Sequence, residues 1–426
     1  MGRFVLKKTL YGLLVLLGVI TLVFSIFSIN PGDPAAMLLG QRADEEAVER
    51  VKRELNLDLP WHKQYVLYLN DLSPISFHST NANSRVYLDS AKYATAGSVS
   101  LGSTVIALKA PYLRRSYQSK KEVSAIIAEA MPGTIVLAVS AILFALILGI
   151  FLGVISAVYQ GRFVDGFSLF SAILGMSAPS FFSAIIISWI GGYLWATQIS
   201  LPGLPIVFGL LVLIISLLRP NKSIIKSVEW TIKGLLLGIG LLVLNSLTVL
   251  IFNFDFLPFR FGTLNFPGTG LNMTGSLWSV DVFEGEYLSL KNLILPMLTL
   301  GIRPLAIVVQ LTRNALLEEL SKDYIRTARA KGLSERTVVL KHALRNALNP
   351  VVTAISGWFA SMLAGAVFVE FVFNWKGLGL QVFQSLQNDD FPVVMGSVLV
   401  IAAAFVVINI FVDIIYGIID PRVRIN

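Results

Sequence analysis

The sequence lacks cysteine altogether, which excludes disulfide bonds, thiolate metal sites and a cysteine nucleophile. Histidine is almost as scarce: His62, His78 and His342 are far apart, and none begins the His-Glu-x-x-His pattern of a zinc hydrolase. A Gly-x4-Gly-Lys-Ser/Thr phosphate loop is also absent, so the chain carries no ATPase motif of that type. The sequence therefore predicts neither a metal site nor a nucleotide-hydrolysing domain.

Charge is scarce as well. Only 14% of the 426 residues are charged, whereas soluble domains carry roughly 25%. With 55% hydrophobic residues and a mean hydropathy of +0.73, the composition is that of an integral membrane protein. Runs with at most one charge that reach the length of a membrane helix, about 20 residues, occur at 10–29, 134–160, 167–218, 234–254, 292–312, 346–369 and 391–412.

The run 167–218 is too long for one membrane span, and Pro202 and Gly203 interrupt it. Counting it as two spans, the sequence predicts an all-α polytopic membrane protein with about eight transmembrane helices. The hydrophobic segment 201–254 is then expected to form a helical hairpin.

Basic residues are unevenly distributed between these runs. They are abundant before the first run and in 219–233 and 313–345, and scarce in 255–291. Basic loops remain in the cytoplasm, so this pattern predicts that both termini are cytoplasmic.

The same orientation divides the chain into three parts. An N-terminal anchor helix, residues 1–29, precedes a long segment, 30–131, that lies outside. We expect this segment to be a partly helical extracytoplasmic domain, with one helix from Asp44 to Leu55. The transmembrane domain then covers 132–426.

The polar, basic stretch 313–349 separates two very apolar runs. Gly332 fits the left-handed position just beyond a helix end, and Ser334 fits the N-cap of a following helix. The first helix is expected to continue from the preceding span with Leu317, Leu320, Tyr324 and Ala328 on one face, and the second to bury Leu340, Leu344, Ala347 and Leu348. Pattern alone leaves three alternatives: a solvated loop, a helix on anionic lipid, or a docking element for a cytosolic partner.

The tip of this stretch carries a resemblance to a known family. Residues 324–334, Tyr-Ile-Arg-Thr-Ala-Arg-Ala-Lys-Gly-Leu-Ser, resemble the cytoplasmic loop of ABC-importer permeases of the dipeptide/oligopeptide/nickel branch. The Glu-Ala-Ala-x3-Gly pattern of the wider family falls on Arg326, Thr327, Ala328 and Gly332, so its first two positions differ here. Further matches lie at 30–34, 295–300, 311–313, 369–379 and 420–422.

This resemblance implies the type I ABC importer permease fold, with an extracytoplasmic insertion after the first span. The chain would be the permease subunit of an ATP-driven importer in the bacterial cytoplasmic (inner) membrane. It would move dipeptides, oligopeptides or a related small solute such as a nickel chelate. No enzyme activity and no cofactor are expected in the chain itself.

The resemblance also implies partners and a coupling site. The partners are a homologous permease subunit, two cytosolic ATPase subunits that bind ATP-Mg, an extracytoplasmic substrate-binding protein and membrane lipid, with no nucleic acid. Movement of the ATPases would reach the membrane through a coupling loop, 313–349. Its contacts are expected from Asp323, Tyr324, Arg326, Thr327, Ala328, Arg329, Ala330, Lys331, Gly332, Leu333 and Ser334.

A secondary transporter or channel with a lipid-surface basic loop is the alternative. It would bury ionisable groups for ion coupling, but only Arg303, Glu370 and Asp413 qualify, and each is expected to pair or to reach the membrane surface instead.

Residues 175–179 depart from the Gly-x-Ser-x-Gly nucleophile motif, because proline replaces the last glycine. Ser177, Pro179 and Ser180 are therefore expected at a helix start that lines the translocation path. The spacing by four of Gly149 and Gly153, and of Gly234 and Gly238, predicts close helix packing.

Overall fold

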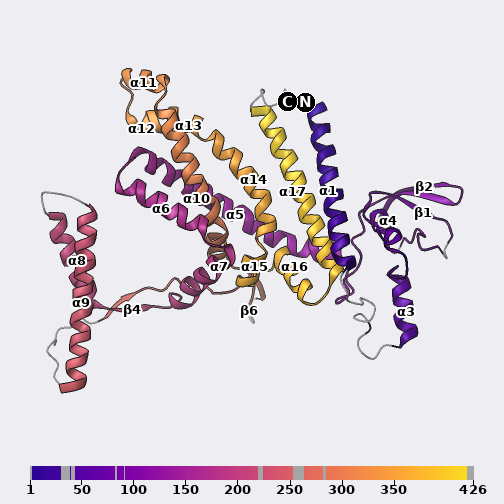
Figure 1. Cartoon of the computed structure of the whole chain (residues 1–426), viewed down its shortest axis with the longest axis horizontal. Coiled ribbons are helices and arrows are strands. Elements are labelled where there is room, and N and C mark those ends of the chain that lie inside the picture. Colours follow the sequence, from indigo (N-terminus) through magenta and orange to yellow (C-terminus); the bar gives the residue numbers. More distant parts are fainter. Residues whose placement is uncertain are drawn as a thin grey trace. The chain divides into compact units, whose positions relative to one another are not determined.

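The computed structural model describes residues 2–29, 39, 44–81, 84–90, 92–218, 224–252, 263–281 and 285–419. Helices dominate these residues, and the chain divides by its contacts into two compact units (Figure 1). The first unit comprises 1–139 with 356–426, and the second comprises 140–355. The predicted motifs at 30–34 and 420–422 lie outside the described residues.

In the first unit, α1 (Gly2–Ile29) and α17 (Phe391–Ile419) lie side by side. A Cβ at Gly12 would lie 2.5 Å from Val406 Cγ1, so glycine permits the close approach. Lys8 Nζ is 2.8 Å from Asp413 Oδ2. This ion pair confirms the prediction that Asp413 has a structural partner.

The helix α4 (Trp61–Leu72) packs against these two helices through aromatic residues. The ring of Phe24 in α1 lies 5.8, 5.2 and 5.5 Å from the rings of Trp61, Tyr65 and Tyr68. The Tyr65 hydroxyl is 2.6 Å from Thr21 Oγ1. Tryptophan and tyrosine gather where membrane helices reach the water interface, so this face of α4 suits an interfacial position.

The segment between α1 and α5 also contains a helix and a small sheet. The helix α3 (Glu45–Glu54) follows Asp44 and confirms the predicted helix. The strands β1 (Ile75–Ser79), β2 (Thr95–Leu101) and β3 (Thr104–Lys109) form an antiparallel sheet in the order β1-β3-β2, with Ile75 opposite Leu108. The sequence prediction of a partly helical domain did not include this sheet.

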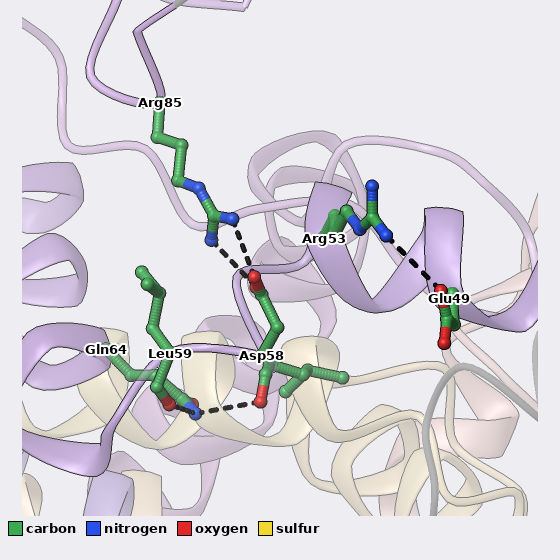
Figure 2. Close-up of polar contacts among 7 residues, drawn as sticks. Glu49, Arg53, Asp58, Leu59, Gln64 and Arg85 are labelled. Atoms are coloured by element: carbon green, nitrogen blue, oxygen red, sulfur yellow. Dashed lines mark hydrogen bonds and ion pairs between the residues drawn. The ribbon is translucent and has the colours of Figure 1, made fainter.

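An exposed ion pair ties the turn between α3 and α4 to the chain after β1 (Figure 2). Arg85 Nη1 and Nη2 donate to the two carboxylate oxygens of Asp58 at 2.7 and 2.6 Å. The guanidinium lowers the pKa of Asp58. The side chain of Gln64 donates to the backbone oxygen of Leu59 at 2.8 Å, which fixes the turn from the other side.

The helix α5 (Val123–Val158) begins before the predicted domain boundary at residue 132, so that boundary falls inside a helix. The second half of α5 packs on α10 (Lys291–Leu320) in the second unit. A Cβ at Gly149 would lie 2.7 Å from Val308 Cγ1, and one at Gly153 would lie 2.7 Å from Thr312 Cβ. These distances confirm the predicted packing role of the two glycines.

The helix α10 belongs to the second unit and contacts α6 (Phe163–Ser177) and α7 (Ser180–Trp189). At its first turn, the Asn292 amide donates to the Ser276 backbone oxygen at 2.8 Å and to Ser279 Oγ at 3.0 Å. Asn272 donates to Asn292 Oδ1 at 2.9 Å. The start of α10 is thereby joined to the segment that precedes it, which contains β6 (Trp278–Asp281) and β7 (Gly285–Leu288).

The hydrophobic segment after α7 forms two paired helices, α8 (Gly203–Leu218) and α9 (Ile224–Phe252). A Cβ at Gly238 would lie 2.5 Å from Pro205 Cα, and one at Gly234 would lie 3.0 Å from the Phe208 backbone oxygen. The predicted close packing at these glycines is confirmed. The strands β4 (Ile199–Pro202) and β5 (Thr263–Phe266), which flank the pair in sequence, form an antiparallel ladder.

The membrane helices differ in number from the prediction. Within the described residues, five helices are long and apolar enough to cross a membrane: α1, α5, α9, α10 and α17. The bent pair α6 and α7 with the π-helix η1 (Ile190–Leu194) raises the number to six if it is one span. The predicted break at Pro202 and Gly203 is therefore not the first interruption of the run 167–218, because the chain already bends by 110° between α6 and α7.

Candidate functional site

The candidate site is the turn that projects from the end of α10. The helix does not continue through Tyr324, because Lys322 is extended (φ −75°, ψ 153°) and a new helix, α11 (Asp323–Ala330), begins after it. The predicted continuation is thus wrong. Lys322 acts as the N-cap, and Asp323 in the first turn is favoured by the helix dipole.

This restart changes which residues are buried. In α11 the buried side chains are Ile325 and Ala328, whereas Tyr324 is exposed. They pack into a core beneath the turn, made of Ala157, Leu316, Ile325, Ala328, Val338, Val339, Ala343 and Ala347. Because α11 has its own apolar support, the turn is a folded element and not an unstructured loop.

The turn itself has the geometry that the sequence predicted. Gly332 has φ +78°, the left-handed conformation that glycine adopts without strain. Its N–H donates to the Arg329 oxygen at 2.9 Å, and the Leu333 N–H to the Ala328 oxygen at 3.4 Å. This pair of bonds is a Schellman motif, which satisfies the last carbonyls of α11 and reverses the chain.

The next helix, α12 (Glu335–Thr337), starts at the predicted N-cap. Ser334 Oγ accepts a hydrogen bond from the Thr337 N–H. Across the turn, Arg329 Nε and Nη2 donate to the Glu335 carboxylate at 2.7 and 3.2 Å. This contact lowers the pKa of Glu335 and joins the end of α11 to the start of α12.

The second arm of the turn departs from the predicted pattern. Its helix widens into a π-helix, η2 (Val338–Ala343), before α13 (Leu344–Ala347). Leu340 is consequently exposed, contrary to the prediction, while Val339 and Ala343 face the core. A π-turn adds a residue to the helical repeat, so the buried face moves by about one position.

The surface of the tip is small and basic. Ala328 is 7% exposed and faces the core, so its side chain supports the turn from within, and its expected contact with a partner stays a prediction. The other predicted coupling residues are exposed: Asp323, Tyr324, Arg326, Thr327, Arg329, Ala330, Lys331, Gly332, Leu333 and Ser334. Ala330 and Lys331 lead directly into Gly332, the position at which the chain turns.

A buried ion pair that the sequence analysis missed supports the base of the turn. Arg313 Nε and Nη2 in α10 donate to the Asp165 carboxylate of α6 at 2.6 and 2.8 Å. Ser156 Oγ and the Gly161 N–H donate to the same carboxylate at 2.6 and 2.9 Å. The signal was present, since Asp165 is the one acid between Glu129 and Glu229 and an isolated acid in an apolar stretch needs a partner.

The predicted path residues lie at the bend between α6 and α7. Ser177 ends α6 and donates to the Ile173 oxygen at 2.8 Å. Ala178 is extended (ψ 131°), as expected for a residue before proline, and Pro179 caps α7, which begins at Ser180. The predicted helix start is therefore confirmed, and the path role of these residues stays a prediction.

The matched stretch 369–379 surrounds a buried carboxylate in the first unit. Glu370, in α15 (Val367–Phe373), is fully buried and accepts hydrogen bonds from Thr134 Oγ1 at 2.7 Å and from the Leu380 N–H at 3.0 Å. A Cβ at Gly377, which precedes α16 (Leu378–Gln387), would lie 2.5 Å from this carboxylate. Glycine is required there because the carboxylate occupies the space of a side chain.

Comparison with known proteins decides the family. Residues 149–425 match the family model described as "Binding-protein-dependent transport system inner membrane component", and residues 1–83 match the model of its N-terminal region. The chain belongs to this family. It is similar to the dipeptide transport system permease protein DppB of Alkalihalophilus pseudofirmus, with 31% identity and 100% of both chains covered.

A second relative is also named as a permease of a dipeptide transport system. The probable D,D-dipeptide transport system permease protein DdpB of Escherichia coli K12 is 33% identical, with 98% of this chain and 97% of the relative covered. The protein is thus an ABC-importer permease of the dipeptide/oligopeptide branch, a multi-pass protein of the inner membrane. The alternative of a secondary transporter or channel is not favoured.

Proposed function

We propose that this permease moves short peptides into the cytoplasm and that the α11–α12 turn is the contact through which ATPase subunits drive it. The family and its relatives support a permease that works with separate ATPase and substrate-binding components. In the proposed assembly, a homologous permease subunit, two ATPase subunits and one extracytoplasmic binding protein accompany this chain. ATP-Mg binds to the ATPase subunits, and both termini of this chain are cytoplasmic.

One observation carries the coupling role: the tip is a compact turn with its own core. The Schellman motif at Gly332 and the ion pair of Arg329 with Glu335 hold α11 and α12 in a fixed geometry. A partner that pushes on the tip therefore moves α10 with it, whereas a loose loop would yield. The charges of Arg326 and Lys331 at the surface suit an acidic groove on the partner.

The absence of native cysteine allows a direct test of this contact. The variant Ala330→Cys places one thiol on the exposed tip, and Ser98→Cys places one on the exposed strand β2 as a matched control. We expect a thiol-to-amine cross-linker to join Ala330→Cys, and not Ser98→Cys, to an ATPase subunit in the assembled complex. No cross-link from the tip in a complex that imports a dipeptide would refute the proposed contact.

A further inference from the structure

The segment between α1 and α5 contains a cavity of about 340 Å³, which is the size of a small-molecule site. Its wall is formed by the end of α3, the end of α4 and the chain that leads into α5. Val51 and Leu55 form an apolar side. The polar side carries the charged residues Asp71, Lys92, Arg114, Arg115 and Lys120.

Positive charge exceeds negative charge in this wall. Among the described residues that line the cavity, Asp71 is the one carboxylate, against the four cations Lys92, Arg114, Arg115 and Lys120. Its side chain accepts a hydrogen bond from the Tyr93 hydroxyl at 2.8 Å, while Lys92 and Arg114 stand 3.9 and 3.8 Å away. At these distances the two cations form ion pairs with the Asp71 carboxylate but donate no hydrogen bond to it.

Aromatic rings cover one of these cations in part. The Lys92 ammonium lies 4.7 Å from the ring centre of Tyr93 and 5.0 Å from that of Tyr112. Burial lowers the pKa of Lys92, and the neighbouring Arg114 adds to this effect against the influence of Asp71. An anion in the cavity would offset the cost of keeping these charges together.

The backbone gives a second, independent observation. Asn56, Arg114 and Lys120 line the cavity with φ of 61°, 68° and 60°. In the described part of the chain only two other non-glycine residues have positive φ. For arginine and lysine this conformation is strained, and such strain clusters where a protein holds a ligand.

We propose that this cavity binds a small molecule through an oxyanion, a carboxylate or a phosphate. The N–H groups of Lys92, Arg114 and Lys120 donate to the oxyanion, and Val51 and Leu55 receive an apolar part of the ligand. The free carboxylate of a short peptide has this chemistry, and that source rests on the proposed function. The phosphate of a lipid headgroup is the other source of the same chemistry.

The chain offers a matched pair of variants for the test. Lys120 lines the cavity, whereas the neighbouring Lys121 does not, so Lys120→Gln and Lys121→Gln remove the same charge from the same loop. Binding is measured on the full-length permease with its partner subunits in phosphatidylcholine nanodiscs, with dialanine, dialanine amide and inorganic phosphate as probes. Because the assay requires neither ATP nor uptake, its failure leaves the proposed transport function standing.

We expect dialanine or phosphate to bind the wild-type protein, and Lys120→Gln to weaken that binding by about tenfold. Lys121→Gln and Lys120→Arg should bind normally, and the uncharged dialanine amide should bind weakly. If the probes bind in phosphatidylcholine nanodiscs but no longer bind when the complex is placed in phosphatidylglycerol nanodiscs, the lipid phosphate is the occupant and the oxyanion site is supported. Equal binding of acid and amide, or an unchanged affinity in Lys120→Gln, would overturn the proposal.

Discussion

Replacement of Gly332 by valine is the perturbation that tests the coupling turn most sharply. A Cβ at this position meets nothing within 4 Å, so the substitution causes no clash. Its cost is that of a β-branched residue held at φ +78°, about 1–3 kcal/mol. The turn can escape this strain only by leaving the left-handed conformation, and that breaks the Schellman bonds of Gly332 and Leu333.

The strain should remain local, because Ile325 and Val338 lie in a core that does not involve Gly332. We therefore expect the Gly332→Val protein to insert into the membrane and to assemble. The population of molecules with the native turn between α11 and α12 should fall by a factor of roughly 5 to 150. Uptake of a dipeptide and ATP hydrolysis stimulated by the binding protein should both be lost.

Two variants separate geometry from charge. Gly332→Asn should retain activity, because asparagine tolerates the left-handed conformation. Lys331→Gln should have a mild effect, whereas a loop held to anionic lipid would lose about 1 kcal/mol for each basic residue removed. Normal transport by the purified Gly332→Val complex would refute the reasoning.

Three further predictions concern other parts of the chain. Gly377→Ala should lower the free energy of unfolding by about 1–3 kcal/mol, because its Cβ would lie 2.5 Å from the buried Glu370 carboxylate. The control Gly357→Ala places its Cβ in open space and should not lower it. Equal melting temperatures of the two variants would contradict this prediction. For the orientation, a membrane-impermeant maleimide should label Ser98→Cys in intact spheroplasts, and Ser334→Cys only after permeabilisation. Burial lowers the pKa of His78, so the contribution of the neutral His78 side chain to stability is complete above about pH 6.5 and is lost as the pH falls. Proteolysis of the segment between α1 and α5 should therefore increase on acidification in the wild type and not in His78→Gln.

Local chemistry explains what the sequence predicted well. The left-handed glycine, the serine cap and the proline bend each depend on the conformational preferences of one or two residues. Gly332, Ser334 and Pro179 could therefore be assigned without knowledge of the rest of the fold. The same is true of Gly149 and Gly153, whose spacing alone indicates a packing face.

Longer-range effects account for what the sequence missed. The exposure of Tyr324 follows from the extended residue Lys322, after which a new helix begins. The exposure of Leu340 follows from the π-helix η2, which no single residue type in the sequence indicates. The role of Gly377 depends on a carboxylate brought to it from another turn of the chain. The bend between α6 and α7 in the run 167–218 could not be predicted either, because hydropathy reports how apolar a segment is and not the direction in which its helices run.

The helix α10 has a mechanical consequence. Its 30 residues make a rod of about 45 Å that carries the coupling turn at one end and, through Asn292, the segment of β6 and β7 at the other. Each degree of tilt of such a rod displaces its far end by about 0.8 Å. Pro296 and Pro304 lie in the half nearer Asn292, so stiffness is greatest next to the tip. Under the proposed coupling, a tilt imposed at the tip would therefore also displace the segment of β6 and β7, with α10 as the rigid link between them.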